Sequence, residues 1–109
     1  MFQSREPYLH NLMDLQPTKA YLITVEGSIE EISPSNGKEF QLEEVQRIVE
    51  GYIEVVYLND RQIMIVNDSG KYNKAANVVA TGIANLHRAL WHGDYICGNT
   101  VICPSEMLP

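Results

Sequence analysis

The chain is poor in cysteine, in basic residues and in long apolar runs. Its 2 cysteines among 109 residues are too few for a disulfide framework at this length. No apolar run approaches the roughly 20 residues that cross a bilayer, and Met1 to Pro7 lacks the apolar centre of a secretory signal. We therefore expect a soluble cytoplasmic protein, without a membrane partner, in which Cys97 and Cys103 are reduced, buried thiols.

Positive charge is scarce, and the negative charge is concentrated in one window. The net charge is −6, and the segment from Glu26 to Asp68 contains ten acidic residues and only three basic ones. Such a surface repels phosphate backbones, so direct nucleic-acid binding is disfavoured and a basic protein partner is favoured. The carboxylates that we expect to contact this partner are Glu30, Glu31, Glu43, Glu44 and Glu50.

Length and composition indicate one domain with flanking segments. A chain of 109 residues with 45% hydrophobic residues can bury a single core. Residues 1–17 form a leader with apolar residues at helix-like spacing, either lying against the domain or serving as a partner-binding or oligomer-forming arm. Residues 18–103 form the α+β domain, and residues 104–109 a flexible tail.

Runs of β-branched and aromatic residues predict three hairpins, over about 20–32, 52–66 and 94–103. The second is the most distinct, with two apolar runs flanking Asn59-Asp60-Arg61. These hairpins predict a small mixed or antiparallel sheet. The exposed edges of such a sheet also allow a homo-oligomer.

Two helices are predicted, over about 41–50 and 77–91. In the first, apolar residues recur at intervals of three and four, and Gly51 provides a left-handed stop. Asn77 fits the N-cap of the second. Its expected buried stripe consists of Val79, Ile83, Leu86 and Leu90.

Several motifs in this order resemble the domain of unknown function 3846 family. They include Val49 to Val56, the strand end from Val66 to Lys71, Asn77 with Ala80-Thr81, and Gly93-Asp94 with Cys97-Gly98-Asn99. The resemblance spans about Tyr21 to Cys103. It implies a source in phages, conjugative elements or gut bacteria, and it implies no activity and no catalytic residue.

No catalytic residue, metal site or cofactor is predicted from the residues either. Asp68-Ser69-Gly70-Lys71 lacks the glycine spacing of a phosphate-binding loop. His87 and His92 are five residues apart and so lie on different faces of a helix, with no Cys-x-x-Cys motif nearby. Catalysis is therefore less expected than binding.

One polar segment is a candidate ligand site, because it places donors, positive charges and an aromatic ring beside a helix N-terminus. The alternative is a solvated connecting loop. The candidate ligand-binding residues are Asn67, Lys71, Tyr72, Asn73, Lys74 and Asn77.

Three functions follow from these patterns. The first is a non-catalytic interaction protein of a phage or mobile genetic element, whose acidic face docks a host or element protein and can serve counter-defence. The second is a small-molecule binding protein for a nucleotide signal. The third is a small enzyme of unknown reaction.

Overall fold

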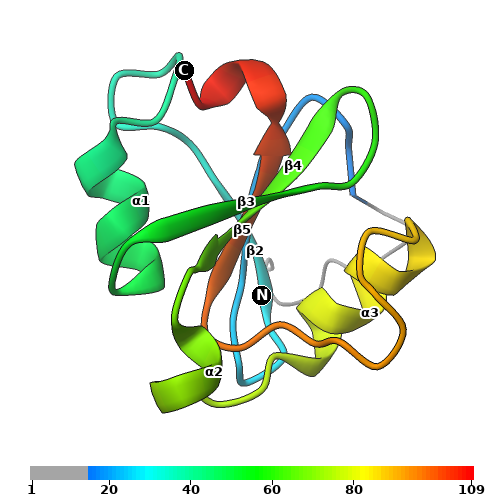
Figure 1. The fold of residues 1–109 in the computed structure, drawn as a ribbon. Coiled ribbons are helices and arrows are strands. Elements are labelled where there is room, and N and C mark those ends of the chain that lie inside the picture. Colours follow the sequence, from blue (N-terminus) through cyan, green and yellow to red (C-terminus); the bar gives the residue numbers. More distant parts are fainter. Residues whose placement is uncertain (1–14) are drawn as a thin grey trace, which may run out of the picture.

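The computed structural model describes residues 15–109, so the leader predicted for residues 1–17 lies almost wholly outside the described residues. Its elements are shown in Figure 1. In chain order they are β1 (Ala20–Ile23), β2 (Ile29–Ile32), α1 (Leu42–Val49), β3 (Ile53–Tyr57), β4 (Gln62–Asn67), α2 (Gly70–Asn73), α3 (Val78–Leu86), β5 (Thr100–Pro104) and the 3-10 helix η3 (Ser105–Met107).

The five strands form one antiparallel sheet in the order β2-β1-β5-β4-β3. The α+β class and the first two hairpins are confirmed: β1 pairs with β2, and β3 pairs with β4. None of the helices in residues 15–109 is long and apolar enough to cross a membrane.

The third predicted hairpin, over 94–103, is wrong, because only β5 is a strand. β5 lies between β1 and β4, so both of its edges are occupied and a strand from residues 94–97 cannot pair with it. That segment pairs instead with the chain before α3, through a bridge between Ala76 and Cys97 and a hydrogen bond from Asn77 N to Ile96 O.

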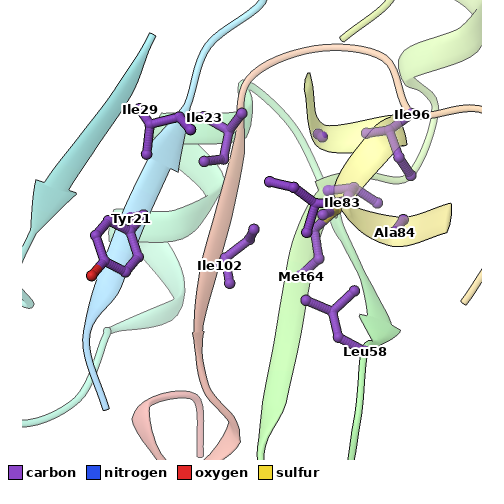
Figure 2. Packing of buried hydrophobic residues seen from close by; sticks show 11 residues of the cluster. Tyr21, Ile23, Ile29, Leu58, Met64, Ile83, Ala84, Ile96 and Ile102 are labelled. Carbon is purple, nitrogen blue, oxygen red and sulfur yellow. The ribbon is translucent and has the colours of Figure 1, made fainter. Parts of the chain in front are cut away.

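Side chains alternate across the sheet and build a core on each face. On one face α1 packs Val45 and Val49, with Phe40, against Ile63 and Ile65. On the other face α3 covers the middle strands, where Ile83 and Ala84 lie near Met64, and the same cluster extends through Ile102 to Tyr21 on β1 (Figure 2). The two helices lie on opposite sides of the sheet (Figure 1).

The first helix ends differently from the prediction. Glu50, not Gly51, takes the left-handed conformation, with φ of 64°. Position 51 needs glycine for another reason, since a Cβ there would lie 2.7 Å from Nδ2 of Asn67. The glycine therefore makes room for a side chain from β4.

The second predicted helix is shorter than 77–91. The Asn77 cap is confirmed, since its side chain accepts a hydrogen bond from Ala80 N, but α3 ends at Leu86. Arg88 then takes a left-handed conformation with φ of 56°, and Ala89 and Leu90 fold back onto the core as part of a loop. In the segment predicted as a polar loop, residues 70–73 form α2.

The segment 104–109, for which the sequence predicts a flexible tail, is held against the domain. Pro104 ends β5 and η3 follows it. Phe40 N donates a hydrogen bond of 2.7 Å to Met107 O, and Met107 and Leu108 pack against the core beneath α1. The segment therefore contacts the domain through a backbone hydrogen bond and two apolar side chains.

Candidate functional site

A hollow of about 610 Å³ lies beside β3, on the face of the sheet that carries α3. We call it the aromatic groove. β3 and the end of β4 supply one part of its lining, α2 a second, and the loop between α3 and β5 a third. The lining residues are Glu54, Val55, Val56, Tyr57, Val66, Asn67, Asp68, Gly70, Lys71, Tyr72, Ala89, Leu90, Trp91, Asp94, Tyr95, Ile96 and Cys97.

The groove exists because α3 is short. Its buried residues pack with Met64 and Ile102 of the middle strands, whereas Val56 of β3 is only partly buried at the margin of that core. The returning loop places Leu90 over this margin without filling the space. α2 lies close by, since a Cβ at Gly70 would be 2.7 Å from Cys97 O. The groove therefore has an apolar floor, at Val56 and Leu90, that residues 15–109 do not fill.

Three exposed aromatic side chains surround this floor. Tyr72 is 90% exposed, Trp91 87% and Tyr95 46%. Tyr57 also borders the groove, but it lies opposite Ile63 in the sheet, so its ring points to the face that carries α1. Aromatic rings are costly to leave in water, and apolar surface gathered around one hollow is typical of a binding site. These rings come from two separate parts of the chain, α2 and the loop after α3, so the fold brings them together.

The groove is acidic. Its lining holds three carboxylates and one ammonium group, a net charge of −2. Lys71 forms an ion pair with Asp94, and its Nζ lies 5.0 Å from the centroid of the Tyr95 ring. The remaining carboxylates, Glu54 and Asp68, have no ion-pair partner among residues 15–109.

The ion pair fixes the charge state of both partners. The hydrogen bond from Lys71 lowers the pKa of Asp94, as does the backbone N–H of Tyr95. The same hydrogen bond to Asp94 raises the pKa of Lys71. Lys71 is therefore a neutralised cation, and the groove is better suited to a cationic or neutral ligand than to a phosphate.

The candidate ligand residues from the sequence divide into two groups. Asn67, Lys71 and Tyr72 line the groove, whereas the structure places Asn73, Lys74 and Asn77 outside it.

Two of the three candidate asparagines are used within the fold. Asn67 Nδ2 donates to Val49 O and Glu50 O, and Asn77 Nδ2 donates to Ile23 O and Gly98 O from a fully buried position. Lys74 pairs with Glu50. Of the six candidates, Tyr72 and Lys71 are the side chains best placed to meet a ligand.

The sequence did not predict the other groove residues that are able to bind a ligand, which are Glu54, Asp68, Trp91 and Tyr95. Trp91 was assigned to a helix, and Tyr95 to a strand. A local signal was present, since Gly93 and its neighbours could have been interpreted as an exposed loop with aromatic residues on both sides.

The five acidic residues predicted to contact a protein lie on two separate elements. Glu30 and Glu31 alternate on β2, so they point toward opposite faces of the sheet. Glu43 and Glu44 lie in the first turn of α1, and Glu50 follows its last.

Three of these five carboxylates already have partners. Glu31 lies 3.5 Å from Lys19, and Glu50 pairs with Lys74. Glu44 accepts backbone hydrogen bonds from Gln41 and Ser35. None of the five lines the groove.

The residues considered for catalysis do not converge. Cys97 lines the groove, whereas His87 lines a smaller hollow of about 210 Å³, and His92 lines neither. Within the described part of the chain, no three His, Cys, Asp or Glu side chains are grouped so as to hold a metal ion. The arrangement is suited to recognition by stacking, charge and apolar contact.

A family model described as "Domain of unknown function" matches residues 18–106, which is most of the chain. No curated protein and no solved structure matches it. The match agrees with the resemblance of the strand and turn motifs described above. The chain belongs to the family of this domain of unknown function, DUF3846.

Proposed function

We propose that this chain is a non-catalytic interaction protein, and that its aromatic groove binds a polypeptide segment that carries lysine or arginine. The observation that carries the proposal is the meeting of three exposed aromatic rings with two carboxylates that have no ion-pair partner among residues 15–109, all around one hollow. Protein interfaces are enriched in Tyr and Trp at the positions that contribute most affinity.

The rings supply affinity because they are exposed before binding. Trp91 is 87% exposed and Tyr72 is 90% exposed, so a partner that covers them removes a large apolar area from water. The apolar floor at Val56 and Leu90 adds contacts for an aliphatic side chain. A mixed aromatic and apolar surface of this kind suits a polypeptide.

The charges supply selectivity. Glu54 and Asp68 favour an ammonium or guanidinium group, and the exposed rings can also bind a cation over their faces. The net charge of −6 on the whole chain attracts a basic partner over longer distances. A partner with a basic segment is therefore favoured over an acidic one.

The identity of that partner is a separate proposal. The family resemblance implies a phage or mobile genetic element as the source, and the partner is then a host or element protein, with counter-defence as one purpose. The acidic side chains of β2 and α1 would add attraction without forming the contact surface.

A selection from a random linear peptide library on the full chain tests the proposal. Enriched peptides should contain lysine or arginine. By calorimetry they should bind the Trp91→Ala variant at least about tenfold more weakly than the unmodified chain. Tyr52→Ala is the matched control, since Tyr52 is 79% exposed but does not line the groove. If no peptide is enriched, or if both variants bind equally, the proposal is wrong.

A small-molecule ligand is the second candidate, favoured by the size of the groove. A hollow of about 610 Å³ lies in the range of small-ligand pockets, which is about 300–1,000 Å³. In this case mass spectrometry of the denatured protein should find a bound compound. Nucleotides, including cyclic dinucleotides, should raise the melting temperature. The acidic lining argues against nucleotides in particular.

A further inference from the structure

We infer that the bound polypeptide segment joins the sheet as an added strand, paired with the outer edge of β3. This inference rests on the proposed function and adds the way in which the partner is recognised. Its four supports are the free edge, the orientation of the backbone groups, the contrast with the other edge, and the position of the groove.

β3 is an edge strand whose outward groups can be assigned from its register. Asp68 N donates to Tyr52 O and Leu58 N donates to Gln62 O, so residues 52 and 58 belong to the hydrogen-bonded pairs with β4. In an antiparallel ladder these pairs alternate along the strand. The backbone N–H and C=O groups of Ile53, Val55 and Tyr57 therefore point away from β4.

Nothing within residues 15–109 pairs with those groups. β3 is the last strand in the sheet order, and no hydrogen bond within that part of the chain involves the outward N–H or C=O of Ile53, Val55 or Tyr57. The strand is five residues long, contains no proline and carries one charge, at Glu54. An edge of this kind is a template for another strand.

The opposite edge of the sheet, formed by β2, has features that prevent strand addition and that β3 lacks. β2 is four residues long, and two of the four are the glutamates Glu30 and Glu31. Pro34 follows it closely and is buried. Charges and short length are common means of preventing strand addition, so β2 is protected and β3 is not.

The groove lies directly beside the open edge. Residues Glu54 to Tyr57 belong both to β3 and to the groove lining. Side chains of an added strand alternate between the two faces of the sheet. Every second side chain of the partner therefore points to the face of the sheet that carries the groove. On that face Glu54 favours a lysine or arginine. This is the β-augmentation mode of peptide recognition.

Charge distinguishes a basic segment from a second copy of this chain. Pairing of two β3 strands about Val55 would place the two Glu54 side chains diagonally across the new ladder, at roughly 7–8 Å. It would also bring together two grooves of net charge −2 and two chains of −6. Like charges oppose this pairing, whereas a basic strand removes the conflict.

Backbone methylation of the peptides enriched on the full chain tests the inference. Replacing a peptide N–H with N-methyl removes a donor and leaves the side chains unchanged. We expect a loss of at least about tenfold in affinity at every second position along a run of four to six residues, and little change at the intervening positions. Losses without this alternation would overturn strand addition.

A pair of variants provides the matching test on the protein. Tyr57→Thr removes the ring and keeps the outward N–H, whereas Tyr57→Pro removes both. Proline is tolerated at an edge position whose N–H faces outward. Tyr57→Pro should bind the peptide at least about fivefold more weakly than Tyr57→Thr. The melting temperature of each variant shows that it is folded.

The two tests separate this inference from the proposed function. Suppose that Trp91→Ala weakens binding, but methylation shows no alternation and the two Tyr57 variants bind equally. The groove is then a peptide site without strand addition. If no peptide is enriched at all, the proposed function fails together with this inference. If light scattering shows a dimer that Tyr57→Pro dissociates and the peptides do not, the occupant of the edge is a second copy.

Discussion

Gly51 and Asn67 fit together at the end of α1, because the missing side chain of the glycine leaves space for the amide of the asparagine. A Cβ at position 51 would lie 2.7 Å from Asn67 Nδ2. That amide donates to Val49 O at 2.9 Å and to Glu50 O at 3.2 Å. Carbonyls at the end of a helix have no partner within the helix, so β4 supplies one.

We predict that Gly51→Ala and Asn67→Ala each reduce the free energy of unfolding by about 1–3 kcal/mol, because each removes the amide from the same two carbonyls. The double variant should lose much less than the sum, since the two changes remove one interaction. Urea unfolding measures all three. Gly82→Ala is the control: nothing lies within 4 Å of its Cβ position, and alanine there should stabilise α3 by roughly 0.5–1 kcal/mol. Additive losses at 51 and 67 would contradict the coupling.

This contact shows why part of the fold could be predicted and part could not. Local periodicity placed α1 within one residue at each end, and the turn at residues 59–61 placed the β3–β4 hairpin. The reason for glycine at position 51 depends on a side chain sixteen residues later, which periodicity does not contain. The sequence therefore predicted the helix end and assigned its left-handed residue wrongly.

Asn77 is the second asparagine with a structural role, and its loss should be more severe. It is fully buried, caps α3 through Ala80 N, and donates to Ile23 O and Gly98 O. Asn77→Ala should reduce the free energy of unfolding by about 2–4 kcal/mol, since it removes the cap and leaves two carbonyls unpaired.

Asn77→Ser separates the two contributions, because a serine hydroxyl can still cap the helix but cannot reach both carbonyls. Its loss should be about half that of Asn77→Ala in the same urea experiment. Asn73→Ala, at an exposed position in α2, should change stability by less than about 0.5 kcal/mol. Equal losses for Ser and Ala would show that the cap contributes little.

The candidate site was harder to predict than the fold. Lys71 and Tyr72 were predicted because they lie in a polar segment just before a helix N-terminus, which is a common kind of ligand site. Trp91 was missed because apolar periodicity continued past Leu86, and only the tertiary structure shows that α3 stops there. Tyr95 was missed because its segment was predicted to be a strand, whereas it lies in the loop before β5. The groove consists of segments that are distant in sequence, so no local pattern describes it.

Glu44 should make the stability of the protein depend on acid pH. Backbone N–H groups of Gln41 and then Ser35 lower its pKa below the ordinary value of 4.5. A lowered folded-state pKa means that the ionised carboxylate stabilises the protein above about pH 4.5. This stabilisation is lost as the pH falls through the folded value.

Urea unfolding of the unmodified chain and of Glu44→Gln between pH 7 and pH 3 measures this effect. The difference in stability between the two should be largest at pH 7 and should shrink as the pH falls below 4.5. Glu43→Gln, in the same turn of α1, is the control for the substitution itself, because neither of the two backbone N–H groups is bonded to the Glu43 side chain. A constant difference across the range would mean that the hydrogen bonds do not favour the ionised form.

The two cysteines should differ in reactivity. Burial raises the pKa of the Cys103 thiol to about 12, and this residue is fully buried in the core beneath α1. Since the thiolate is the reactive form, a disulfide reagent at pH 8 should not label Cys103 in the folded Cys97→Ala variant. In the Cys103→Ala variant, Cys97 is 6% exposed and lines the groove, so it should react measurably faster. Both variants should react fully in denaturant. Equal reaction rates of the two folded variants would contradict the deeper burial of Cys103.

Trp91 should contribute to binding and almost nothing to stability. Its side chain is 87% exposed, so Trp91→Ala should change the free energy of unfolding by less than about 0.5 kcal/mol. It is also the one tryptophan in the chain, which makes its fluorescence a direct probe of the groove. A peptide selected on the full chain should shift the emission to shorter wavelength and reduce quenching by acrylamide, because the ring becomes covered. The same peptide should have no such effect on the protein in urea, where the groove is lost. A peptide that binds tightly in calorimetry and leaves the emission unchanged would place the binding surface elsewhere on the molecule.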